Sequence, residues 1–256
     1  MSYLDSLILG IVEGLTEFLP VSSTGHLILV SHILNIPQTE FLKSFEIAIQ
    51  LGSILAVVFI FWRSFINVDI LKRLVVAFIP TGIVGFLLYR LIKDYLIGNT
   101  AVVVWALFLG GVAIIAIEHF QKKQNQEEEE VTSMTYTQSF FVGLAQALAV
   151  IPGVSRSGAT VMGGLLLGIS RTTILTFSFL LAVPTMLAAT AYDLYKTPEV
   201  FTSVNLSLLA VGFITAFFVA LIVIKFALAF VKKYSFVPFA LYRMVVAIVF
   251  AFVFLY

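Results

Sequence analysis

Two glutamates four positions apart, Glu13 and Glu17, stand in an otherwise apolar stretch near the start of the sequence. On a helix this spacing places both carboxylates on one face, about 6 Å apart. Two like charges so close need compensation by a divalent cation, an arginine or a shared proton. Carboxylate oxygens suit Mg²⁺ or Ca²⁺, so the pair is predicted to hold such an ion. The wall of a water-filled vestibule is the alternative.

A second polar group follows within a few residues. Ser22, Ser23 and His26 come after Pro20, which interrupts a helix. The break places the two hydroxyls and the imidazole on a loop or at the start of the next helix. A hydroxyl and a nearby base together make an activated nucleophile. We therefore predict catalytic roles for these three residues alongside the two glutamates.

A third polar group follows the break at Pro152 and Gly153. Arg156 supplies planar, paired donors that match the geometry of phosphate, and free backbone N–H groups at a helix start also bind anions. Arg156 is thus predicted to act in catalysis and in phosphate binding. Ser and Thr also cap helices or pack between membrane helices. The other residues predicted to bind phosphate are Ser155, Ser157, Gly158 and Thr160.

The composition places these polar groups in a membrane. The 256 residues are 61% hydrophobic and 11% charged, against about 25% charged in an ordinary soluble domain. The net charge of +1 provides no basic surface for nucleic acid. With no cysteine, the chain has no thiolate nucleophile and no disulfide. Catalysis must therefore come from Ser, Thr, His, carboxylates or Arg.

The apolar runs are near the length of about 20 residues that crosses a hydrocarbon core of about 30 Å. Two of the polar groups, the motif at Ser22 to His26 and the motif at Ser155 to Thr160, lie in stretches broken by Pro and Gly. The backbone groups freed there must be satisfied by protein or water. The economical prediction is a re-entrant pair of half-helices at each break, over 4–34 and 138–169. The predicted transmembrane helices cover 45–62, 72–92, 101–118, 174–192, 206–226 and 236–256.

Three more polar residues fall in apolar surroundings, where an ionisable group is costly and by default marks function. Glu46 and Gln50, four positions apart, either extend the site or hydrogen-bond between helices. Arg243 lies in the last apolar run and either pairs with a carboxylate or reaches toward the interface. All three are candidate site residues.

The sequence also aligns with itself, without a gap, at a shift of 133 positions. Ser22 then falls on Ser155 and Gly25 on Gly158, so the two motifs coincide. The chain is predicted to be a single membrane domain, 1–256, that contains a duplicated unit. Its parts are repeat one at about 1–118, an acidic cytoplasmic loop at about 119–138, and repeat two at about 139–256.

Three spans after each hairpin give the two halves opposite topology, as in the inverted repeats of many transporters. Lys and Arg gather on the cytoplasmic side of membrane proteins, and the predicted topology places eight of them on one side and four on the other. The side with eight is predicted to be cytoplasmic, and both termini are predicted to face outward. The eight are Arg63, Lys72, Arg73, Lys122, Lys123, Arg171, Lys232 and Lys233; the four are Lys43, Arg90, Lys93 and Lys196.

Four segments carry a family resemblance: GIVEGLTEFLPVSSTGHLIL, FEIAIQLGSILAVVFIFWR, IPGVSRSGATVMGGLLLGISR and FSFLLAVPTMLAAT. Nearly end to end, the chain resembles the bacterial undecaprenyl-diphosphate phosphatase family, also called the bacitracin-resistance family. The resemblance implies a hydrolase of the bacterial cytoplasmic membrane. Its substrate would be undecaprenyl diphosphate, a polyprenyl diphosphate, and its products undecaprenyl phosphate and inorganic phosphate. The monophosphate is the lipid carrier for peptidoglycan and cell-wall synthesis.

The resemblance further implies a divalent metal ion and a site open to the outer face. The implied fold is all-α and polytopic, with six transmembrane helices and two re-entrant helical hairpins in inverted-topology repeats, which agrees with the organisation above. The expected partners are the polyprenyl diphosphate and membrane lipids, and no nucleic acid is expected. A homodimer is a compatible oligomeric state. By position, Glu13 and Glu17 match the family's acidic pair, Ser22, Ser23 and His26 its serine–histidine motif, and Ser155, Arg156, Ser157 and Thr160 its PGxSRSxxT motif.

Two other functions fit part of the pattern. A second lipid phosphatase family, with an SGH motif and a later SR, needs a downstream histidine, and no His follows Arg156. A transporter fits inverted repeats and broken helices, and fold alone does not exclude it. Phosphate release by the detergent-purified protein separates the enzyme from the transporter.

Overall fold

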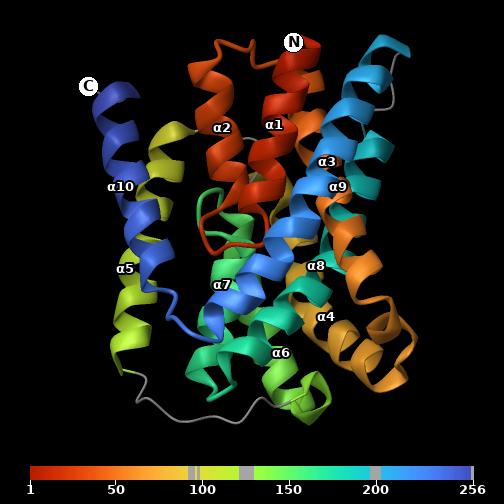
Figure 1. Ribbon diagram of the computed structural model, residues 1–256, viewed down its shortest axis with the longest axis vertical. Coiled ribbons are helices and arrows are strands. Elements are labelled where there is room, and N and C mark those ends of the chain that lie inside the picture. Colours follow the sequence, from red (N-terminus) through yellow and green to blue (C-terminus); the bar gives the residue numbers. More distant parts are fainter. Residues whose placement is uncertain (92–95, 97–98, 121–129, 197–202, 255–256) are drawn as a thin grey trace.

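The computed structural model describes residues 1–91, 96, 99–120, 130–196 and 203–254 (Figure 1). Over these residues all regular structure is helical, which confirms the predicted all-α class. Most of the acidic loop (121–129), with Lys122 and Lys123, lies outside the described residues, as does Lys93.

The described ranges hold ten α-helices and three short 3₁₀ helices. In chain order they are α1 (Tyr3–Thr16), α2 (Ser23–Ile33), α3 (Glu40–Ile60), η1 (Trp62–Ile66), α4 (Val68–Leu91), α5 (Thr100–Phe120), η3 (Val131–Ser133), α6 (Tyr136–Ala147), η4 (Leu148–Val150), α7 (Arg156–Leu166), α8 (Arg171–Lys196), α9 (Ser203–Val231) and α10 (Val237–Phe254).

Five helices, α3, α4, α5, α8 and α9, are long and apolar enough to cross a membrane. Helix α10 is also apolar, but its described apolar stretch, Val237–Phe252, is shorter. Large apolar side chains point outward from several of these helices, as Phe59, Phe86 and Ile222 do with 69%, 74% and 71% of their surfaces exposed. Such a surface suits lipid rather than water, so the chain is an integral, polytopic membrane protein.

Helices occur at all six ranges predicted to span, but their ends differ from the ends of the apolar runs. Helix α3 begins at Glu40 instead of residue 45, because the Thr39 hydroxyl accepts a hydrogen bond from the backbone N–H of Leu42 at 3.2 Å. This N-cap satisfies a backbone donor that would otherwise lack a partner. Capping chemistry, and not hydropathy, therefore sets where the helix starts.

The two stretches broken by Pro and Gly each connect a pair of short helices, α1 with α2 and α6 with α7. Helices α1 and α2 lie at the end of the molecule that carries the N-terminus, and α6 lies toward the opposite end (Figure 1). The last described turn of α10 lies at the same end as the N-terminus. The chain between α1 and α2 meets the start of α7, where the Ser157 hydroxyl donates to the Leu19 carbonyl at 2.8 Å. The two polar motifs are thus brought together inside the molecule.

Small residues allow the short helices to approach the long ones closely. A Cβ atom on Gly143 of α6 would lie 1.9 Å from the Ala77 carbonyl oxygen on α4, far inside van der Waals contact. The Thr81 hydroxyl donates to the Gly143 carbonyl at 2.9 Å. Gly10 of α1 meets Gly212 of α9 in a similarly close contact. Close approach of this kind stabilises helix pairs in a membrane, where apolar burial supplies little net driving force.

A buried carboxylate joins three helix ends. Glu118, near the end of α5, accepts two hydrogen bonds from Arg171 at the start of α8, at 3.1 and 2.5 Å. It also accepts one from the backbone N–H of Phe236, just before α10, at 2.9 Å. The paired geometry is the strong form of an Arg–carboxylate contact. This cluster fixes α5, α8 and α10 relative to one another.

Candidate active site

The local backbone is the same at the start of α2 and of α7. Ser22 and Ser155 are the N-caps, and both have positive φ angles, 71° and 79°. Each hydroxyl accepts a hydrogen bond from the glycine N–H three positions on, Gly25 at 3.3 Å and Gly158 at 3.1 Å. Non-glycine residues rarely adopt such angles, and they cluster at functional sites where surrounding contacts hold them.

Arg243 of α10 holds both turns in place. Its side chain is fully buried and donates to backbone carbonyls only. In the first turn it contacts Pro20 at 3.1 Å, and in the second Gly153 at 2.6 Å and Val154 at 3.1 Å. On α5 it contacts the carbonyls of Ala106 and Leu107 at 3.1 and 2.9 Å. Among the described residues Arg243 thus pairs with no carboxylate, and it ties the two motifs to α5.

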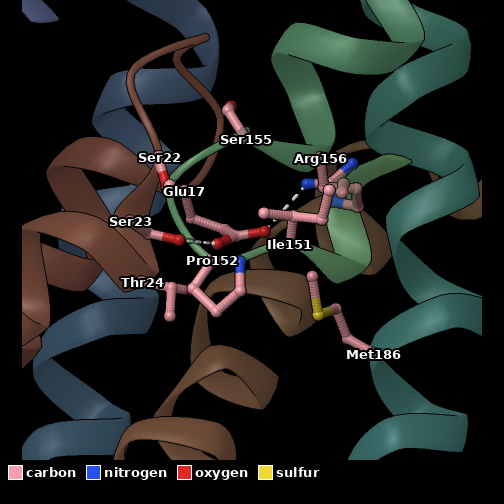
Figure 2. A pocket seen from close by; sticks show the side chains of 11 residues that line it. Glu17, Ser22, Ser23, Thr24, Ile151, Pro152, Ser155, Arg156 and Met186 are labelled. Atoms are coloured by element: carbon pink, nitrogen blue, oxygen red, sulfur yellow. Dashed lines mark hydrogen bonds and ion pairs between the residues drawn. The ribbon is translucent and has the colours of Figure 1, made fainter. Parts of the chain in front are cut away.

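A small cavity of about 70 Å³ lies between the two turns. Figure 2 shows Glu17 in its centre, between Ser23 on one side and Arg156 on the other. Most of the polar lining comes from the two motifs, and Met186 of α8 adds an apolar wall. The lining residues are Glu17, Ser22, Ser23, Thr24, Ala149, Ile151, Pro152, Gly153, Ser155, Arg156 and Met186.

Glu17 joins the two motifs through a pair of contacts. Its Oε1 accepts from Nη2 of Arg156 at 2.8 Å, and its Oε2 accepts from the Ser23 hydroxyl. The carboxylate is therefore placed to receive the Ser23 proton while the arginine balances its charge. A hydroxyl bonded to a base that a third group orients is the arrangement of an activated nucleophile.

Of the other two nitrogen atoms of the Arg156 guanidinium, one has a hydrogen-bond partner and one has none among the described residues. Nη1 donates to the Ser178 carbonyl at 2.7 Å, and the Ser178 hydroxyl contacts that of Thr160 at 2.6 Å. Nε is buried and has no hydrogen-bond partner among the described residues. A buried donor without a partner is rare in proteins, and here it belongs to a side chain that lines the cavity. Arg156 therefore retains one buried donor that no described residue uses.

Further carboxylates lie behind Glu17. Glu13 is fully buried one helical turn away, and its electrostatic neighbours are Glu17, Arg156 and Glu46. Neither Glu13 oxygen has a hydrogen-bond partner of good geometry among the described residues, and the same holds for Oε1 of Glu46. The Ser53 hydroxyl also interacts with the Glu13 carboxyl group. Glu13, Glu17 and Glu46 thus gather carboxylate oxygens around one arginine.

These oxygens fit a hard divalent cation. No three His, Cys, Asp or Glu side chains of the described residues gather closely enough to hold an ion on their own. Mg²⁺ commonly takes one or two carboxylates and completes its shell with water and substrate phosphate. The carboxylates of Glu13 and Glu17 fit this mode of Mg²⁺ coordination.

His26 does not line the cavity. Its Nδ1 contacts the Ser22 carbonyl at 2.8 Å and its Nε2 the Tyr242 hydroxyl at 3.0 Å. Because a carbonyl can only accept, Nδ1 carries the proton, and Nε2 of the neutral ring accepts from the tyrosine. The Tyr242 ring also stacks on the imidazole, with centroids 5.5 Å apart and planes 10° apart. In this geometry His26 holds the backbone of the strained Ser22 turn.

The predicted site residues thus divide by position. Glu17, Ser22, Ser23, Ser155 and Arg156 line one cavity. The other predicted residues do not line it; they are Glu13, His26, Glu46, Gln50, Ser157, Gly158, Thr160 and Arg243.

Several residues that contact the site were not among the predicted ones, including Ala149, Ile151, Pro152 and Gly153 in the cavity wall. Thr24 and Met186 line the cavity, and Ser178 binds Arg156. Ser178 and Met186 both lie in the segment FSFLLAVPTMLAAT, which carries part of the family resemblance, but no role was predicted for either.

Comparison with known proteins identifies the family of the chain. Residues 6–249 match the family model described as bacitracin resistance protein BacA. Proteins named undecaprenyl-diphosphatase from Aquifex aeolicus (strain VF5) and Sulfurihydrogenibium sp. (strain YO3AOP1) are each 51% identical to the chain, with coverage of 100% and 98% of both sequences, respectively. A protein of the same name from Wolinella succinogenes is 52% identical over 98% of both. The chain therefore belongs to the bacitracin resistance protein BacA family, as its motifs predicted.

Proposed function

We propose that this protein hydrolyses undecaprenyl diphosphate to undecaprenyl phosphate and inorganic phosphate. The observation that carries the proposal is the Ser23–Glu17–Arg156 arrangement, with a nucleophile, a base and a free buried donor around one cavity. The full-length similarity to proteins named undecaprenyl-diphosphatase supports the choice of substrate. The product is the lipid carrier that cell-wall synthesis requires, which agrees with a family named for bacitracin resistance.

In the proposed reaction the terminal phosphoryl group occupies the cavity beside Arg156. The Ser23 oxygen forms a bond to that phosphorus while its proton passes to Glu17. The bond from the phosphorus to the bridging oxygen breaks, and undecaprenyl phosphate leaves. Water then attacks the phosphorus of the phosphoserine, and the bond from the phosphorus to the Ser23 oxygen breaks. Glu17 returns its proton to Ser23, and the protons of the water leave with inorganic phosphate. Direct attack by water, with Glu17 as the base, is the alternative route.

Positioning and charge balance contribute most of the acceleration in phosphoryl transfer. Arg156, through its free Nε, and the backbone N–H groups at the start of α7 would stabilise charge on the transferring group. A divalent cation, Mg²⁺ or Ca²⁺, held by Glu13 and Glu17 would neutralise diphosphate charge. His26 and Arg243 contribute by holding the two turns.

We further propose that the chain is one membrane domain with six spans and two re-entrant hairpins, α1–α2 and α6–α7. The two halves would form inverted repeats about the acidic loop. The bias of Lys and Arg favours an orientation with both termini outside. Membership of the family favours a bacterial cytoplasmic membrane location and a site that opens to the outer face. The matching geometry of Ser22 and Ser155 supports the duplication.

The deciding experiment measures phosphate release from undecaprenyl diphosphate by detergent-purified protein. Wild-type protein should release phosphate, lose activity with EDTA and regain it with added Mg²⁺ or Ca²⁺. Glu17→Gln should abolish the activity, whereas Glu40→Gln, at an exposed ion pair with Lys43, should not. Folded wild-type protein that releases no phosphate with either metal would favour a transporter.

A further inference from the structure

An apolar groove of about 680 Å³ lies beside the polar cavity, between α4, η4 and the α6–α7 pair. Its lining comes from Val, Leu, Ile, Phe, Ala and Gly residues only. The size lies within the range of about 300–1,000 Å³ that small-molecule sites occupy. Nothing in the chemistry proposed above uses this groove.

One short segment forms the wall between the polar cavity and the groove. Along 148–151 the side chains divide between the two spaces: Ala149 lines the cavity, whereas Leu148 and Val150 line the groove. Ile151 lines both. The two spaces are therefore neighbours that share Ile151 in their walls.

We propose that this groove binds the isoprenoid chain of the diphosphate substrate. The inference rests on the proposed function, because it uses the diphosphate site as its fixed point. In a prenyl diphosphate the α-phosphate is attached to the first carbon of a single isoprenoid chain. With the terminal phosphoryl group beside Arg156 and the α-phosphate next to it, the first isoprene units would lie toward Ile151, where the apolar lining starts.

Chain chemistry favours an isoprenoid over an ordinary phospholipid. A glycerophospholipid carries two chains and separates its phosphate from them by a glycerol unit, so it does not place one chain against the phosphate cavity. The groove also has an open side, because Leu144, Leu148 and Leu88 are 47%, 60% and 40% exposed. A long chain can therefore enter sideways from the lipid and extend beyond the groove.

The first test compares chain lengths. The double variant Leu144→Trp/Leu148→Trp fills the groove from two exposed positions, so the fold should tolerate it. We expect kcat/KM for undecaprenyl diphosphate to fall about tenfold or more, in line with the discrimination of hydrophobic pockets. For the five-carbon isopentenyl diphosphate it should change by less than about twofold. The matched control is Leu109→Trp/Leu206→Trp, at lipid-facing leucines that are 57% and 50% exposed elsewhere on the protein.

An equal loss for both substrates, or no loss for either, would overturn the groove assignment. The control variant should behave like wild type with both substrates. Wild-type protein that hydrolyses neither substrate would instead refute the proposed function. The two failures are therefore distinct.

The second test does not depend on turnover. A photoreactive p-benzoylphenylalanine at position 148 should crosslink radiolabelled undecaprenyl diphosphate in phosphatidylglycerol vesicles, and excess unlabelled undecaprenyl diphosphate should compete. The same amino acid at position 109 should give only background crosslinking. Equal prenyl crosslinking at 148 and 109, or crosslinking to phosphatidylglycerol alone at 148, would show bulk lipid in the groove and refute the proposal.

Discussion

Arg156 and Glu17 lie 139 positions apart in the sequence, and their side chains form a buried ion pair at 2.8 Å. Each belongs to a different motif, so neither motif forms the cavity alone. The pair neutralises charge on the base that accepts from Ser23, and it leaves Nε of the guanidinium free. The first prediction follows from this geometry.

Arg156→Lys should keep the positive charge but lose the planar fork that contacts Glu17, Ser178 and the substrate. We expect kcat to fall about 10²- to 10³-fold, the range for loss of one oriented donor to a transition state. Phosphate release by purified protein measures the effect. Arg63→Lys, at a half-exposed arginine beside Trp62, is the control and should remain active. Near-normal turnover of Arg156→Lys would show that the paired donors of Arg156 are not needed for catalysis.

Ser23→Ala separates the two routes of attack. If Ser23 is the nucleophile, the variant should be inactive, and rapid quenching of the wild type should trap phosphoserine at position 23. Ser31→Ala, on the same helix and bonded to the Ile28 carbonyl at 3.0 Å, should retain activity. Substantial turnover by Ser23→Ala would show that water attacks directly with Glu17 as base.

Tyr242→Phe tests the positioning of His26. The substitution keeps the stacked ring but removes the hydroxyl on Nε2, a bond worth about 1 kcal/mol. We expect kcat to fall by up to about tenfold with KM little changed, together with a shift of the His26 ¹⁵Nε2 resonance that reports the lost hydrogen bond. Tyr3→Phe removes a similar hydroxyl, 2.9 Å from that of Ser207, and should alter neither. An unchanged Nε2 resonance in Tyr242→Phe would contradict the contact.

Gly143→Ala should destabilise the contact of α6 with α4, because the new Cβ meets the Ala77 carbonyl oxygen. Overpacking of this kind costs about 1–3 kcal/mol, which thermal unfolding in detergent would show as a lower Tm. Gly85→Ala is the matched control on α4, where an added Cβ meets nothing within 4 Å. It should leave Tm unchanged or raise it, since alanine favours a helix. Equal Tm values for the two variants would mean that α6 and α4 move apart at little cost.

Sequence alone was sufficient for the membrane class, the helical fold, the two breaks and the family. These depend on local properties: apolar run length, Pro and Gly at fixed places, and short polar motifs. The ends of helices were less predictable, because a cap such as Thr39 extends α3 through the polar residues Glu40 and Lys43. Hydropathy carries no information about that hydrogen bond.

Which polar residues meet was decided only by the tertiary structure. In helices that are apolar on most faces, the pattern does not say which face turns inward. The spacing of Glu13 and Glu17 was readable, but Glu17 alone lines the cavity. The motif containing His26 was readable too, but its contact with Tyr242, 216 positions away, was not. Such pairings depend on how helices far apart in the chain rotate and pack, and no local pattern records that.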